Sequence, residues 1–194
     1  MVLSDAHKYP FSLFSESKDA SSGAKVEREG NVTDAMDKSI GRAVIKIKGA
    51  VSANNYIDFS NLQLEGQHVC IQLCMMKSNI ATIHIELQTS RSISLRVTIS
   101  TLYDVPRFLG RSLRLPLPVK TGWVNVHMDM NEMLRLYCPM QGSQSKDSFK
   151  CIRRVQLCSN LIVRDLVTSN QPLISYKMPV KDLAVVSNAA ARVQ

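Results

Sequence analysis

The sequence predicts an all-β protein, an antiparallel two-sheet sandwich of jelly-roll type with one short helix. Three observations predict this fold. Apolar and polar residues alternate over many short segments, these segments recur at spacings of about ten residues, and helical spacing is found in a single stretch. With 194 residues, 45% of them hydrophobic, the chain is long enough for one well-buried domain.

We expect three parts along the chain: an amino-terminal arm and mobile loop over 1–40, a β-sandwich domain over 41–182 and a flexible tail over 183–194. Residues 9–14 form an apolar island, for which packing on its own domain and binding to a partner both stay open. Residues 15–38 are rich in Ser, Gly, Lys, Glu and Asp and poor in large apolar residues, a composition typical of a mobile loop.

Period-two alternation predicts the strands of the sandwich. They lie at 41–48, 55–59, 69–75, 82–87, 92–99 and 123–129. The strands at 82–87 and 92–99 should form a meander hairpin. The segment 105–122 contains three prolines, which remove backbone donors, so we expect at most an edge strand joined by a long connection.

A short helix is predicted after the strand at 123–129. Asp129, with Glu132 three residues on, is an N-cap arrangement. The apolar residues that follow fall at helical spacing: Met130, Met133, Leu134 and Tyr137. One helix of about two turns therefore interrupts the strands.

Residues 151–168 consist of two aliphatic and β-branched runs separated by the pair Ser159 and Asn160. A two-residue polar break between such runs predicts a hairpin. Arg153 and Arg154 cannot both face solvent on a regular strand, so one of them must be paired, at an edge or beside a bulge.

No catalytic or metal motif is found in the sequence. It contains no Gly-x-Gly spacing, no Gly-x-Ser-x-Gly elbow and no His-Glu-x-x-His. Cys70 and Cys74 are four residues apart on a predicted strand, roughly 13 Å, which is too far for one shared ion. We therefore expect no enzyme activity, no metal and no cofactor.

The cysteines and the apolar runs indicate the compartment. Five cysteines, an odd number embedded in apolar runs, are typical of free thiols in a reducing environment. No secretory signal precedes residue 10, and no run approaches the roughly 20 apolar residues of a membrane span. We expect a cytoplasmic protein without a membrane partner.

The formal net charge of +8 favours polyanionic partners. Cations gather in the segment 105–128, around 146–164 and on the strand at 41–48. The candidate partner-binding residues are Lys46, Lys48, Arg107, Arg111, Arg114, Lys120, Arg153, Arg154 and Arg164. Two interpretations stay open: a generally basic surface, and convergence of some of these residues into one anion-facing patch.

Several segments resemble the domain of cilia- and flagella-associated protein twenty. They are Tyr9-Pro-Phe11, Gly49-Ala-Val-Ser-Ala-Asn-Asn-Tyr-Ile57, Gly122-Trp123, Val155 to Ser169 and Met178-Pro-Val180. The segments at 9–11, 49–57 and 155–169 are most similar to the amino-terminal domain of a centriolar WD-repeat protein of the inner scaffold, whereas those at 122–123 and 178–180 resemble the wider family. The sequence contains no WD repeats, so we expect either a fragment of such a protein or a stand-alone relative.

The resemblance implies a function. The family is a jelly-roll-like sandwich on microtubules of centrioles, basal bodies and axonemes, at the inner junction between tubules. It implies a non-enzymatic structural module of the cytoskeleton, in the centriole, basal body or cilium, with tubulin and other centriolar or axonemal proteins as partners. The basic charge agrees, because tubulin presents acidic surfaces and acidic tails.

Two other functions stay open. Jelly-roll sandwiches also bind carbohydrates and other ligands through exposed aromatic residues. The candidates here are Tyr56, Tyr103, Trp123 and Tyr176. Nucleic-acid binding is supported by charge alone, and the aromatic content of 6% is low for a stacking platform.

Overall fold

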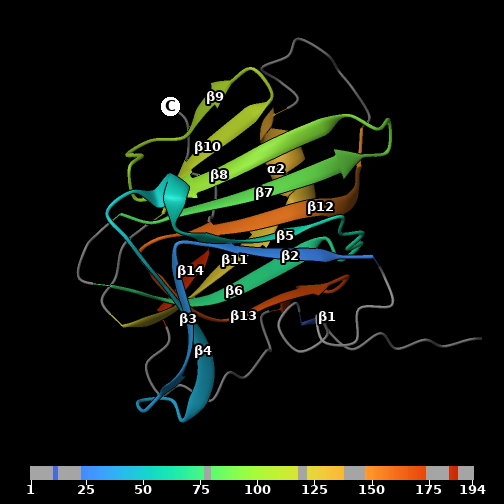
Figure 1. The fold of residues 1–194 in the computed structure, drawn as a ribbon. Coiled ribbons are helices and arrows are strands. Elements are labelled where there is room, and N and C mark those ends of the chain that lie inside the picture. The colour runs from blue at the N-terminus through green and yellow to red at the C-terminus, as the bar shows by residue number, and fades with distance from the viewer. Residues whose placement is uncertain are drawn as a thin grey trace, which may run out of the picture.

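The computed structural model describes residues 11–12, 23–76, 80–117, 122–137, 147–173 and 184–187. They form two seven-stranded β-sheets (Figure 1). Sheet A holds, in spatial order, β14 (Ala184–Ser187), β11 (Trp123–Asp129), β6 (His68–Met75), β13 (Leu161–Ser169), β4 (Arg42–Lys48) and β3 (Asn31–Asp37), with β1 (Phe11–Ser12) paired to β13. Sheet B holds β2 (Lys25–Glu29), β5 (Tyr56–Ser60), β12 (Phe149–Cys158), β7 (Thr82–Thr89), β8 (Ser94–Ser100), β10 (Ser112–Pro116) and β9 (Arg107–Leu109).

The strand order is that of a jelly roll, so the predicted fold is confirmed. Strands β4, β13, β6 and β11 are neighbours in sheet A, and β5, β12, β7 and β8 are neighbours in sheet B. The predicted meander is confirmed as well, because β7 and β8 pair antiparallel from Thr82 opposite Ser100 onward. Two pairs, β8 with β10 and β11 with β14, are parallel.

The core lies between the two sheets and follows from the alternation. Residues Val69, Ile71 and Leu73 of β6 are almost fully buried, as are Ile83 and Ile85 of β7 in the other sheet. Each such side chain contributes about 1.5–3 kcal/mol relative to an exposed position. The residues between them consequently point to the outer faces, where Cys70 and Gln72 of β6 are buried as well and His84 of β7 is half-buried.

The predicted helix is α2 (Met130–Tyr137). The Asp129 carboxylate accepts hydrogen bonds from the backbone N–H groups of Asn131 (2.9 Å) and Glu132 (3.3 Å), as an N-cap residue does. Met130, Met133 and Leu134 are buried. Within the part of the chain that is described, no helix is long and apolar enough to cross a membrane.

The hairpin expected over 151–168 is wrong. Strand β12 pairs with β5 and β7 in sheet B, whereas β13 pairs with β4 and β6 in sheet A. The pair Ser159 and Asn160 is therefore a corner at which the chain crosses from one sheet to the other. Both residues are buried, so they do not form an exposed turn. Their polar side chains instead form hydrogen bonds with the backbone of a neighbouring segment.

Asn160 holds this corner through its side chain. The Gly49 N–H donates to Asn160 Oδ1 (2.9 Å), and Asn160 Nδ2 donates to the Gly49 carbonyl (3.0 Å). Ser159 Oγ donates to the same carbonyl, and Ser52 Oγ donates to the carbonyl of Ser159. Two segments that carry the family resemblance, 49–57 and 155–169, thus meet at one corner of the sandwich.

The loop and the tail expected at the two ends are wrong in part. Strands β2 and β3 lie within the expected loop over 15–38, and β14 lies within the expected tail over 183–194. The sheets therefore extend beyond the expected domain limits of 41–182. Residues of β2 and β3 are mostly solvent-exposed, so these strands carry the polar composition of a loop.

The structure describes only a part of the apolar island at 9–14 and none of the closing segment at 178–180. Of the apolar island at 9–14, β1 is described and its backbone pairs with β13 of its own domain. Residues 13–22 and the closing segment 178–180 lie outside the described residues.

The segment 105–122 contains two strands where at most one edge strand was expected. Strand β9 is at the edge of sheet B, and β10 lies one position further in, beside β8. The prolines do not prevent this arrangement, because Pro106 precedes β9 and Pro116 is the last residue of β10. The β9–β10 pair and the β3–β4 hairpin lie at opposite ends of the molecule (Figure 1).

We predict that Asn160→Ala lowers the free energy of unfolding by about 1–3 kcal/mol, because the Gly49 N–H loses its acceptor and the Gly49 carbonyl keeps only the donor Ser159 Oγ. Urea unfolding measures this change. Asn170→Ala is the matched control, since Asn170 is exposed in the turn after β13, and it should change the value by less than about 0.5 kcal/mol. Equal stability of the two variants would contradict the role given to the corner.

Candidate partner-binding surface

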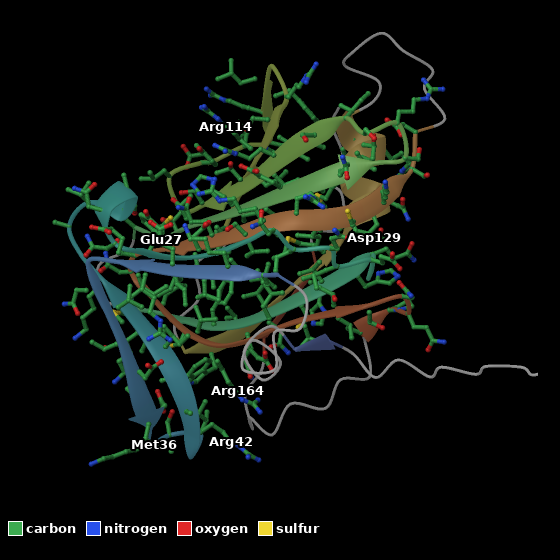
Figure 2. All side chains as sticks on the ribbon, turned by 45° about the vertical axis from the view of Figure 1, so that its right-hand side comes forward. Glu27, Met36, Arg42, Arg114, Asp129 and Arg164 are labelled. Carbon is green, nitrogen blue, oxygen red and sulfur yellow. The ribbon has the colours of Figure 1, made fainter. Side chains whose placement is uncertain are left out.

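The structure describes eight of the nine predicted cations and divides them between the two sheets. Arg107, Arg111, Arg114, Arg153 and Arg154 belong to sheet B or its turns, whereas Lys46, Lys48 and Arg164 belong to sheet A. Lys120 lies outside the described residues. Figure 2 shows Arg114 at the opposite side of the molecule from Arg164 and Arg42. The nine residues consequently do not form one patch, and any convergence is limited to those of sheet B.

Two of the arginines of sheet B are neutralised by carboxylates on its outer face. Arg154 Nε donates to Asp58 Oδ1 at 2.6 Å, and this hydrogen bond raises the pKa of Arg154. Arg96 pairs with Glu86 on the neighbouring strand, and Glu86 also lies 3.8 Å from Arg154. The sequence had not singled out Arg96, although its polar position in the 92–99 alternation was the available signal.

Arg153 lies at an irregularity of strand β12. The register between β12 and β7 shifts between Ile152 and Arg154, and the Arg153 carbonyl accepts a hydrogen bond from the Leu62 N–H. The expectation was that one of the two neighbouring arginines is paired, at an edge or beside a bulge, and it is confirmed. Arg154 is paired, and Arg153 is in the bulge.

Three arginines at the β9–β10 end of sheet B are left without a carboxylate partner. Within the described residues, Arg107 and Arg111 have no hydrogen-bonded or ionic side-chain partner, and Arg114 contacts the ring of Tyr103 at 5.6 Å. Arg107 and Arg114 are directly opposite on the antiparallel pair β9–β10, so they share one face. We call Arg107, Arg111 and Arg114 the arginine edge.

A shallow, open depression adjoins the arginine edge. It is lined by Glu86, Ser94, Leu95, Arg96, Arg111, Ser112 and Arg114. The parallel pairing of β8 with β10 creates it, since this pairing places Arg96 opposite Ser112 and brings the Arg111 carbonyl onto the Arg96 N–H. Three guanidinium groups face one carboxylate there, so the depression has an excess of positive charge.

Large apolar side chains are exposed beside the arginine edge. Leu102 and Leu109 are each 62% exposed and Val105 is 50% exposed, all within the β8–β9 connection and β9. Exposed apolar residues next to unpaired arginines are typical of surfaces that bind another protein, because arginine and apolar contacts dominate such interfaces.

On the outer face of sheet A some polar groups are paired within the sheet, whereas Gln72 Nε2 and Asn125 Oδ1 are buried without a hydrogen-bond partner among the described residues. Arg164 donates to Gln72 Oε1 at 2.6 Å, and Cys70 Sγ lies 3.9 Å from His127 Nε2. Burial raises the pKa of the Cys70 thiol to about 12, so this thiol is not a nucleophile at neutral pH. Among the described residues, no three His, Cys, Asp or Glu side chains are grouped so that they could hold a metal ion.

The comparisons with known proteins identify the family. Residues 7–181 match the family model of the CFA20 domain. The chain therefore belongs to the CFA20 domain family, as the resemblance indicated.

Relatives of known name are much longer than this chain. It is 29% identical over 187 residues to centriole proteome protein 16 of Chlamydomonas reinhardtii, with 92% of this chain and 9% of that protein covered. It is 26% identical over 180 residues to WD repeat-containing protein 90 of Homo sapiens, with 79% of this chain and 10% of that protein covered. The chain thus spans a small part of the relatives that it matches.

The solved structures to which this chain is similar are distant from it. A mutant of the family 29 carbohydrate-binding module CBM29-2 has a TM-score of 0.36 at 10% identity, covering 81% of this chain and 99% of that one. An exo-beta-agarase has a TM-score of 0.43 at 9% identity, covering 85% of this chain and 25% of that one.

We predict that Arg154→Gln lowers the free energy of unfolding by about 2 kcal/mol. The Asp58 side chain is 5% exposed and would lose its ionic partner, while the 38% exposure of Arg154 keeps the cost below that of a fully buried pair. Urea unfolding tests this, with Arg135→Gln as control. Arg135 is 74% exposed in its pair with Glu132, so its loss should leave the free energy of unfolding nearly unchanged.

We predict that His84 makes stability fall in mild acid. Burial lowers the pKa of His84 below the ordinary 6.5, and the nearby Arg96 and Arg154 lower it further. Below pH 6.5 the His84 imidazole is therefore protonated more readily in the unfolded chain than in the folded chain. The free energy of unfolding should decrease as the pH falls below 6.5. Urea unfolding at about pH 7.5 and 5.5 should show a smaller decrease for His84→Gln. An unchanged decrease would contradict this assignment.

Proposed function

We propose that this chain is a non-enzymatic microtubule-binding module of the centriole, basal body or axoneme, and that it contacts tubulin through the arginine edge. The observation that carries the proposal is the absence of carboxylate partners for Arg107, Arg111 and Arg114 in the described part of the chain, on a surface that also exposes apolar side chains. A basic surface of this kind suits the acidic surface of tubulin.

Family membership supports the same proposal. The chain belongs to the CFA20 domain family, and one relative is centriole proteome protein 16. A location on the cytoskeleton of the centriole, basal body or cilium follows for this chain as part of the proposal. Other centriolar or axonemal proteins are proposed as further partners.

The arrangement of carboxylates supports a non-enzymatic role. Acid–base catalysis needs carboxyl groups that converge in a cleft with perturbed pKa values. On the outer face of sheet B, Asp58 and Glu86 are instead engaged by Arg154 and Arg96. These carboxylates organise the sheet surface and leave the arginine edge as the chemically distinctive feature.

The aromatic residues do not favour carbohydrate binding. Trp123 is buried, Tyr56 is half-buried with its hydroxyl toward Glu27, and Tyr103 is covered by Arg114. Tyr176 lies outside the described residues. Sugar-binding sandwiches need exposed aromatic faces, which these three do not offer.

We predict that the chain pellets with polymerised tubulin at low salt and that reversal of Arg107, Arg111 and Arg114 to Glu abolishes pelleting. Binding should weaken as salt rises, since exposed charges are screened over about 8 to 10 Å at physiological ionic strength. Arg154 is left unchanged, because its reversal would place a like charge beside the buried Asp58. Co-sedimentation with circular dichroism as a check on folding measures both effects.

The matched control reverses Arg42, Lys46 and Lys48 of sheet A, which changes the net charge by the same amount. Pelleting should persist in this variant. Loss of pelleting in the control alone would assign the contact to sheet A and reject the arginine edge. Equal loss in both variants would mean that net charge rather than a defined surface causes binding, and no pelleting of the unmodified chain would reject microtubule binding.

A further inference from the structure

We infer that the depression between β8 and β10, together with the arginine edge, binds the carboxylates of an extended acidic peptide. This inference rests on the proposed function, under which the peptide is the flexible acidic tail of tubulin rather than its folded surface. It adds to that function the kind of segment that is recognised and the residues that recognise it.

Strand pairing places the cations in a compact array. Thr98 of β8, Arg114 of β10 and Arg107 of β9 are neighbours across three adjacent strands, and Arg96 and Ser112 are neighbours in a second row. Adjacent strands are about 4.8 Å apart and alternate residues of a strand about 6–7 Å apart, so these backbone positions lie within about 12 Å of one another. Arg111 is in the turn that joins β9 to β10 and lines the same depression.

The groups in the depression are those that bind carboxylates. A guanidinium group can donate two parallel hydrogen bonds to one carboxylate. The hydroxyl groups of Ser94 and Ser112 also line the depression and can donate further hydrogen bonds. The lining carboxylate, Glu86, is already paired with Arg96, so an incoming carboxylate would meet Arg111 and Arg114 without a competing anion from the lining.

The shape of this surface suits an extended chain. A stable contact between two folded surfaces buries about 800 Å² on each partner. Strand β9 has three residues and forms a narrow edge of sheet B. Alternate side chains of an extended peptide project to one side about 6–7 Å apart, a spacing at which successive glutamates can reach Arg111, Arg114 and Arg107.

The apolar residues around the arginines favour a peptide over a nucleic acid. Leu102, Val105 and Leu109 are exposed there and can pack on the aliphatic parts of glutamate side chains. The ring of Tyr103 nearby is already engaged by the Arg114 guanidinium, whose Cζ lies 5.6 Å from the ring centroid.

Fluorescence anisotropy tests the site with a labelled peptide of ten glutamates and a matched peptide of ten glutamines. We expect salt-sensitive binding of the glutamate peptide alone. Arg111→Gln and Arg114→Gln should each weaken it about two- to fivefold, whereas Lys46→Gln and Lys48→Gln should leave it unchanged. Equal weakening by both sets, binding of the glutamine peptide, or tighter binding of a ten-nucleotide uridine RNA would overturn the inference.

A second experiment separates this inference from the proposed function. Microtubules are trimmed with a protease that removes the tubulin tails, and pelleting of the full chain is compared on trimmed and untrimmed polymer. The inference predicts loss of pelleting on trimmed microtubules. Equal pelleting on both would overturn it while the proposed function stands, and no pelleting on untrimmed microtubules would reject the proposed function itself.

Discussion

The hydrogen bonds between Asn160 and Gly49 form the constraint on which the arrangement of the sandwich depends. At this corner the chain leaves sheet B after β12 and enters sheet A as β13. The backbone of the corner is itself paired, because the Ser159 N–H donates to the Asn55 carbonyl and the Met76 N–H donates to the Asn160 carbonyl. The Asn160 amide replaces the missing backbone partner for both the N–H and the carbonyl of Gly49. A buried corner without such a substitute would leave polar groups unsatisfied, at a cost of about 1–3 kcal/mol each.

The same corner decides which arginines can act together. Because β12 and β13 belong to different sheets, Arg154 and Arg164 lie on different outer faces although they are ten positions apart in sequence. Arg164 then finds Gln72 in sheet A, and Arg154 finds Asp58 in sheet B. Neither is available for a shared patch with the arginine edge, which is built from β9, β10 and the turn between them.

The arginine edge keeps its charge because the carboxylates of sheet B are used elsewhere. Asp58 lies on β5 and Glu86 on β7, away from the β9 edge of the sheet, and they neutralise the arginines that neighbour them there. Arg107 and Arg114 face one another at the edge, an arrangement that is unfavourable for folding and therefore well suited to an anionic partner. Positive charge is thus concentrated at one end of the sheet rather than spread over its surface.

The sequence by itself determined the sandwich, most of its strands, the capped helix and the family, since alternation, capping and turn signals act over short distances. It also indicated that one of Arg153 and Arg154 is paired, at an edge or beside a bulge. Tertiary structure alone decided that Ser159 and Asn160 form a corner between sheets, that β2, β3 and β14 join the sheets, and that Arg96 lies beside Arg111. The reason is that pairing partners distant in sequence set these features, and a local pattern of polar and apolar residues is the same for a hairpin turn and for a corner.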